Sequence, residues 1–183
     1  MKKLIGTIVV LIILGGGGYY VYTSSGTHGT TPQPAAPAYT VPPLTQDYTN
    51  STYHFTLKMP ADFKASEIAG DPTSGSPDTI VLQDTNGNGI QIAVSPFDED
   101  TTGSYTLTKA RILQDVPDLT ITDDQPVVVG SNYTGLAFRS DNQAFGGDSR
   151  EVWFVFRGNL YQISTYARLD DLLKAIFGTW QFN

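Results

Sequence analysis

The stretch EVWFVFRGNLYQISTYA, residues 151–167, decides the fold. Two apolar runs flank a turn about Gly158-Asn159, which predicts an antiparallel hairpin. Successive strand residues point to opposite faces, and both faces of the first run are apolar, one with Val152, Phe154 and Phe156, the other with Trp153 and Val155. A strand that is apolar on both faces is typical of the centre of a sheet that is covered on both sides. We therefore expect this hairpin to lie mostly in the core.

Similar patterns extend in both directions along the chain. Alternating apolar residues predict strands within 53–59, 61–68, 78–97, 118–130 and 131–142. Apolar residues three and four apart predict helices at 106–116, which Pro117 ends, and at about 169–178. Strands and helices do not alternate one by one, as a parallel sheet would require. The pattern therefore predicts an α+β domain with a mainly antiparallel sheet flanked by helices.

Three segments carry a resemblance to a known family. They are YHFTLKMPADFK (53–64), GNLYQISTYA (158–167) and the closing FGTWQF (177–182). In this order they resemble the PsbP/Mog1-like α-β-α sandwich, a family of an extrinsic photosystem II subunit, a Ran-binding transport factor and many bacterial surface proteins. The resemblance covers about 47–183 and implies a binding protein of the bacterial, membrane-anchored branch. It implies no particular partner-binding residue.

The first 25 residues predict a membrane segment. Lys2 and Lys3 precede an apolar run, and a helix from Leu4 to Tyr22, 19 residues at about 1.5 Å each, would be about 28 Å long, close to a bilayer core of about 30 Å. The lysines predict a cytoplasmic N-terminus and an extracytoplasmic domain, as in a single-pass cell-membrane protein. The alternative is a signal peptide that is cleaved near Thr23–Gly26, which would leave a secreted protein.

Residues 26–46, GTHGTTPQPAAPAYTVPPLTQ, are rich in proline and threonine and carry no charged side chain. This composition is typical of a disordered, semi-stiff linker, so the predicted domain spans 47–183. The whole chain has 11 basic and 18 acidic residues, a net charge of −7, and no cysteine. This balance argues against nucleic-acid binding, and the missing cysteines exclude disulfides, thiolate nucleophiles and thiolate metal ligands.

The segment Asp84-Thr85-Asn86-Gly87-Asn88-Gly89 matches the first half of a calcium-binding loop, with oxygen ligands at alternate positions. The twelfth position, which needs an acidic residue, is Ser95, and the flanking segments alternate as strands. A tight hairpin turn is the main interpretation. A weak calcium site at Asp84, Asn86 and Asn88 is the alternative, and no other cofactor is expected.

Tyrosines offer a candidate ligand site. If part of the aromatic hairpin is exposed, Tyr133, Tyr161 and Tyr166 would present rings and hydroxyls at the strand ends to a peptide or sugar. The main interpretation places these aromatic runs in the core. Ser149-Arg150-Glu151 is interpreted as an exposed cross-strand pair, with a binding clamp as the alternative.

Catalytic motifs are weak. Acidic residues occur as sequence neighbours, which point to opposite faces of a strand, and the domain's one histidine, His54, lies in a predicted strand. We therefore expect a non-catalytic, membrane-tethered extracytoplasmic binding or adaptor domain whose partner is an envelope protein or a cell-wall component. The alternatives are a carbohydrate hydrolase that uses Asp98, Asp123 and Asp170, and a calcium-responsive surface module.

Overall fold

A computed structural model of the chain describes residues 39–97, 99, 105–130 and 133–183. The predicted membrane segment, residues 1–25, and the first part of the predicted linker lie outside these ranges. Within them, no helix combines the length and apolar character that a membrane span requires.

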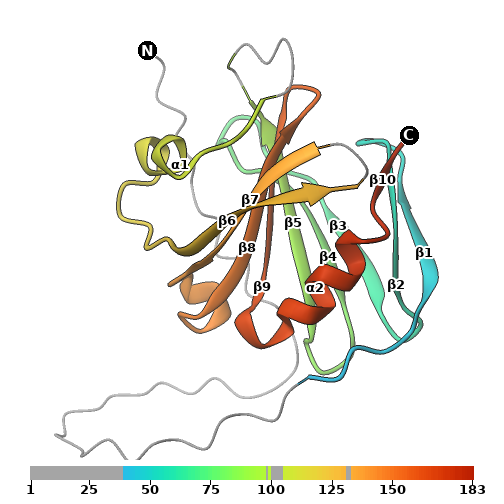
Figure 1. Ribbon diagram of the computed structural model, residues 1–183. Helices are drawn as coiled ribbons and strands as arrows, with labels where there is room; N and C mark the ends of the chain where they lie inside the picture. The colour runs from blue at the N-terminus through green and yellow to red at the C-terminus, as the bar shows by residue number, and fades with distance from the viewer. Residues whose placement is uncertain (1–38, 98, 100–104, 131–132) are drawn as a thin grey trace, which may run out of the picture.

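A seven-stranded antiparallel sheet forms the centre of the domain (Figure 1). In spatial order its strands are β3 (Lys64–Ile68), β4 (Asp78–Gln83), β5 (Gly89–Pro96), β9 (Asn159–Tyr166), β8 (Ser149–Phe156), β7 (Tyr133–Ser140) and β6 (Thr122–Val129). The hairpin β8–β9 lies at the middle of the sheet, and every residue of β8 is buried. The prediction that this hairpin is central and mostly core is confirmed.

The turn of this hairpin differs from the prediction by one residue. Arg157 and Gly158, with φ of 49° and 73°, form the two-residue loop, and Phe156 pairs with Asn159. Positive φ at both loop residues is the geometry whose twist matches that of the strands. A turn at Gly158-Asn159 would pair Glu151 with Tyr166, whereas the observed register pairs Glu151 with Ser164.

One face of the large sheet packs against α2 (Asp170–Phe177) and a second, three-stranded sheet of β1 (Leu44–Asn50), β2 (Phe55–Pro60) and β10 (Gln181–Phe182) (Figure 1). The apolar stripe of α2 is fully buried there, as the spacing of Leu172, Leu173, Ile176 and Phe177 predicts. Each large side chain buried in this way contributes about 1.5–3 kcal/mol to folding. This face holds the main core.

The opposite face packs against α1 (Lys109–Asp115) and its flanking segments. Thr108 caps this helix by accepting a hydrogen bond from the Arg111 N–H, and Pro117 follows its end. The buried Ile112 packs with Trp153 and Val155 of β8. Because α1 is only seven residues long, it covers only part of this face.

The predicted linker boundary at residue 46 is wrong. Strand β1 begins at Leu44, inside the predicted linker, and pairs with β2. Tyr39, Val41 and Leu44 also pack against the main core. Proline and threonine tolerate this extended backbone, and residues 39–46 are ordered because they pair with β2 or pack on the core. Amino-acid composition alone does not reveal these contacts.

Candidate functional site

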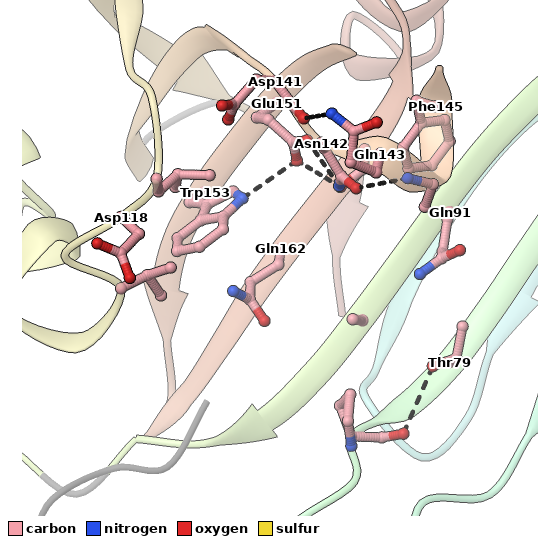
Figure 2. A pocket seen from close by; sticks show the side chains of 16 residues that line it. Thr79, Gln91, Asp118, Asp141, Asn142, Gln143, Phe145, Glu151, Trp153 and Gln162 are labelled. Carbon is pink, nitrogen blue, oxygen red and sulfur yellow. Dashed lines mark hydrogen bonds between the residues drawn. The ribbon is translucent and has the colours of Figure 1, made fainter. Parts of the chain in front are cut away.

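A cavity of about 380 Å³ opens on the face of the large sheet that α1 partly covers (Figure 2). Its volume lies within the range of small-molecule sites, about 300–1,000 Å³. The floor consists of two adjacent cross-strand rows, which are Thr79, Ala93, Gln162 and Trp153, and next to them Gln91, Ser164 and Glu151. We call this cavity the Glu151 pocket.

Glu151 is the most heavily hydrogen-bonded side chain of the floor, although only 2% of it is exposed. Its Oε1 accepts from Ser149 Oγ at 2.7 Å and Asn142 Nδ2 at 3.2 Å, and lies 3.3 Å from Ser140 Oγ. Its Oε2 accepts from Ser164 Oγ and, at 3.3 Å, from Trp153 Nε1. Burying a carboxylate is costly unless it is hydrogen-bonded, and these contacts occupy the lone pairs of both oxygens. Glu151 therefore joins β7, β8, β9 and the segment after β7.

That segment forms one wall of the pocket. Asn142 begins the short 3-10 helix η1 (Gln143–Phe145), and its Oδ1 accepts from the Ala144 N–H at 3.0 Å. The Phe145 ring lies edge-on to Tyr166, with centroids 5.4 Å apart. Since the amide of Asn142 binds both η1 and Glu151, the wall is attached to the floor (Figure 2).

Residues after α1 form the facing wall, with Val116, Asp118 and Leu119. The two walls are joined where Thr120 donates to Asp141, from Oγ1 at 2.8 Å and from its N–H at 3.3 Å. The hydrogen bond from the Thr120 side chain, followed in size by the one from its backbone N–H, lowers the pKa of Asp141 below its usual value. Asp141 thus remains ionised at the edge of the pocket at neutral pH.

Two floor amides keep free hydrogen-bonding capacity. Gln91 and Gln162 are half-buried, and within the described residues neither side chain has a hydrogen-bond partner. The described lining also contains three carboxylates, of Asp118, Asp141 and Glu151, and no lysine, arginine or histidine. The pocket therefore offers polar groups and negative charge to a ligand.

The three predicted ligand-binding tyrosines do not share a surface. Tyr161 is 1% exposed and stacks on Phe154 with centroids 4.8 Å apart, so the prediction that it contacts a ligand is wrong. Burial raises its pKa to about 12. Tyr161 lies on the face of β9 that packs against the small sheet. The alternation of residues along β9 does not show whether that face is covered or open to solvent.

The other two tyrosines lie far apart along the strands. Tyr133 is half-buried at the start of β7 and contacts Phe156 and Phe182, whereas Tyr166 is half-buried at the end of β9 beside Phe145. Ligand binding by Tyr133 and Tyr166 stays a prediction.

The Asp84–Asn88 segment forms the tight turn between β4 and β5. Asp84 Oδ1 accepts from the N–H groups of Asn86 and Asn88, each at 2.8 Å, and Oδ2 accepts from Asn88 Nδ2 at 2.8 Å. Burial alone would raise the pKa of Asp84, but the hydrogen bonds from Asn88 and Asn86 lower it. No group of three or more His, Asp or Glu side chains suited to a metal occurs in the described part of the chain. Calcium binding at Asp84, Asn86 and Asn88 stays a prediction.

The acids of the hydrolase alternative lie elsewhere. Asp98 is outside the described residues, while Asp123 and Asp170 line a second cavity of about 440 Å³ together with Arg139 and Arg150. Asp170 is already paired with Arg150 at 3.1 Å and with Lys174 at 2.8 Å. Hydrolysis by these acids stays a prediction.

The interpretation of Ser149-Arg150-Glu151 as exposed is wrong. Arg150 and Glu151 are 7% and 2% exposed, and they point to opposite faces of β8. Both faces of β8 are covered. The Arg150 side chain reaches Asp170 of α2, and the Glu151 side chain enters the pocket. One signal of the pocket was present in the sequence and was missed. Two polar residues, Gln162 and Ser164, share a strand face with Leu160 in an otherwise apolar hairpin.

Comparison with known proteins supports this architecture. One solved structure, "Solution Structure of Cyanobacterial PsbP (CyanoP) from Synechocystis sp. PCC 6803", matches with a TM-score of 0.52 and 14% identity over 86% of this chain and 98% of that chain. The chain has a PsbP-like fold. No protein-family model matches the sequence, and no curated protein matches it either. At this identity the likeness concerns the fold alone.

Proposed function

We propose that this protein is a membrane-tethered, extracytoplasmic binding domain without catalytic activity, and that its ligand occupies the Glu151 pocket. The observation that carries the proposal is a cavity of ligand size whose floor and wall are held together by one buried carboxylate. Such pre-organisation lowers the entropy cost of binding. The ligand belongs to an envelope protein or a cell-wall component.

Two features favour binding over catalysis at this site. The lone pairs of Glu151 accept hydrogen bonds from the protein, so its carboxylate serves to hold the pocket together. On the floor, the side chains that remain open to a ligand are the amides of Gln91 and Gln162. These groups orient ligands through hydrogen bonds.

The pocket is tested with the full-length chain in detergent and a fragment set that contains cationic, neutral and anionic compounds, followed by NMR. Ala93→Leu fills the floor, because Ala93 lines the cavity, and Ala65→Leu on the exposed edge strand β3 is the matched control. We expect fragments to bind the parent and the control but not Ala93→Leu. Absence of any binding to the parent, or equal binding to Ala93→Leu, would refute the proposed site.

Tethering is tested separately by fractionating cells and measuring the mass of the mature N-terminus. An intact N-terminus in the membrane fraction supports a retained anchor. A chain that begins near Thr23–Gly26 in the medium supports secretion, and an intact chain in the cytosol contradicts the proposed location.

A further inference from the structure

We propose that the Glu151 pocket binds a positively charged ammonium or guanidinium group carried on an apolar stem. This inference rests on the proposed function of the pocket and assigns its ligand chemistry. The same chemistry is found in lysine and arginine side chains and in free alkylamines.

Charge is the first argument. The pocket's three carboxylates face no lysine, arginine or histidine among its described lining residues, and the whole chain carries a net charge of −7. An anion would enter this field without a compensating cation, whereas a cation would be attracted from solution. Asp118 is exposed at the edge of the pocket, where it can meet an incoming cation without being desolvated first.

Hydrogen-bond polarity is the second argument. Glu151 accepts hydrogen bonds from two floor residues, Trp153 and Ser164, and from Asn142 of the wall. Ser164 therefore retains lone pairs that can accept. Gln143 Nε2 likewise donates to the Asp141 carbonyl at 3.0 Å (Figure 2). Apart from the two floor amides, the free capacity of the pocket is thus biased towards acceptors, which suit a ligand with several N–H donors.

The amides of Gln91 and Gln162 are compatible with this bias. A primary amide can turn either its oxygen or its NH₂ group towards a ligand. Each amide can therefore turn one acceptor oxygen towards an ammonium or guanidinium group.

Apolar surface is the third argument. Val116, Leu119 and Phe145 contribute to the walls, and Ala93 and Trp153 to the floor. An alkyl stem such as that of lysine covers apolar surface while its charged end meets polar groups. A small inorganic cation would leave this surface unused.

The test uses the full-length chain in detergent with Nα-acetyl-lysine amide and Nα-acetyl-arginine amide as probes. Nα-acetyl-norleucine amide keeps the stem without the charge, and Nα-acetyl-glutamate amide carries a single charge of the opposite sign. We expect NMR titration to place both cationic probes in the pocket, at least about tenfold more tightly than norleucine amide, which corresponds to about 1.4 kcal/mol. Higher salt should weaken the cationic probes.

A charge-reversal variant locates the effect. Asp118→Lys should reduce the affinity for lysine amide by about tenfold or more, because it places a like charge at the pocket edge. Asp62→Lys changes the net charge equally at an exposed residue in the turn after β2, outside the pocket lining, and should have little effect. Both substitutions are at exposed residues, so folding is retained.

Three outcomes overturn the inference. If norleucine amide or glutamate amide binds as tightly as lysine amide, or if Asp62→Lys weakens lysine amide as much as Asp118→Lys, the pocket does not select a cation. In both of these cases the pocket still binds ligands and the proposed function survives. If no compound of any charge binds, both proposals fail. Comparing n-pentylamine with lysine amide distinguishes a free amine from a peptide side chain, and either result supports the inference.

Discussion

Glu151 illustrates how one buried side chain organises a whole site. Glu151→Gln replaces one acceptor oxygen with an NH₂ group, which then faces donors such as Ser149 or Trp153. We expect a loss of about 1–3 kcal/mol in the free energy of unfolding, the usual cost of unsatisfied buried donors. Urea denaturation measures it. Asp62→Asn makes the same chemical change at an exposed residue and should stay within about 0.5 kcal/mol of the parent. An equally small effect of Glu151→Gln would contradict the role given to its hydrogen bonds.

Asp84 makes a pH-dependent contribution. Its folded-state pKa is lowered, so its stabilisation is present above its unfolded pKa of about 3.9 and is lost as the pH falls through the folded value. Asp84→Ala should therefore cost about 1 kcal/mol at pH 7, and the difference from the parent should shrink below about pH 4. Urea denaturation at several pH values checks this. Thr85→Ala, at an exposed residue of the same turn, is the control, and its effect should not depend on pH. A constant Asp84→Ala effect down to pH 2 would refute the prediction.

At the level of elements, the β8–β9 turn sets the register that builds the pocket floor. Gly158 has a φ of 73°, and an added Cβ would meet nothing within 4 Å. Gly158→Ala therefore incurs only the conformational cost of a left-handed residue, about 1–2 kcal/mol. Thermal and urea unfolding measure it. Gly178→Ala is the matched control, because Gly178 at the end of α2 has a helical φ of −62° and ordinary contacts for a Cβ. It should be neutral or slightly stabilising, and an equal loss in both variants would rule out the turn explanation.

At the level of the whole molecule, the second sheet closes the main core, and β1 is its outer strand. A chain of residues 39–183 should unfold cooperatively, because it keeps every described element. A chain of residues 51–183 lacks β1, including the buried Tyr48 and Asn50, and exposes the edge of β2. We expect it to aggregate or to unfold without a cooperative transition, as monitored by near-UV circular dichroism and denaturation. If the shorter chain were as stable as the longer one, the role given to β1 in closing the core would be refuted.

The sequence by itself determined the α+β class, the antiparallel hairpin at the centre of the sheet, and both helices to within a few residues. These features depend on local periodicity, which a strand or helix carries along its own length. The positions of Val152 and Trp153 on opposite, buried faces followed directly from alternation. Burial of Tyr161 and ordering of Leu44 did not, because each depends on the small sheet, which segments distant in the chain assemble.

Only the tertiary structure decided the site. Gln91, Gln162 and Glu151 come from three strands, and the one-residue shift of the turn determines which of their side chains are neighbours. A carboxylate at one end of an apolar strand looks solvent-exposed in the sequence, because three of its hydrogen-bonding partners, Ser140, Asn142 and Ser164, lie 9 to 13 residues away. They reach it only because β7 and β9 pair with β8. Periodicity assigns a face to a residue; only the packed sheet shows what covers that face and whether a cavity remains.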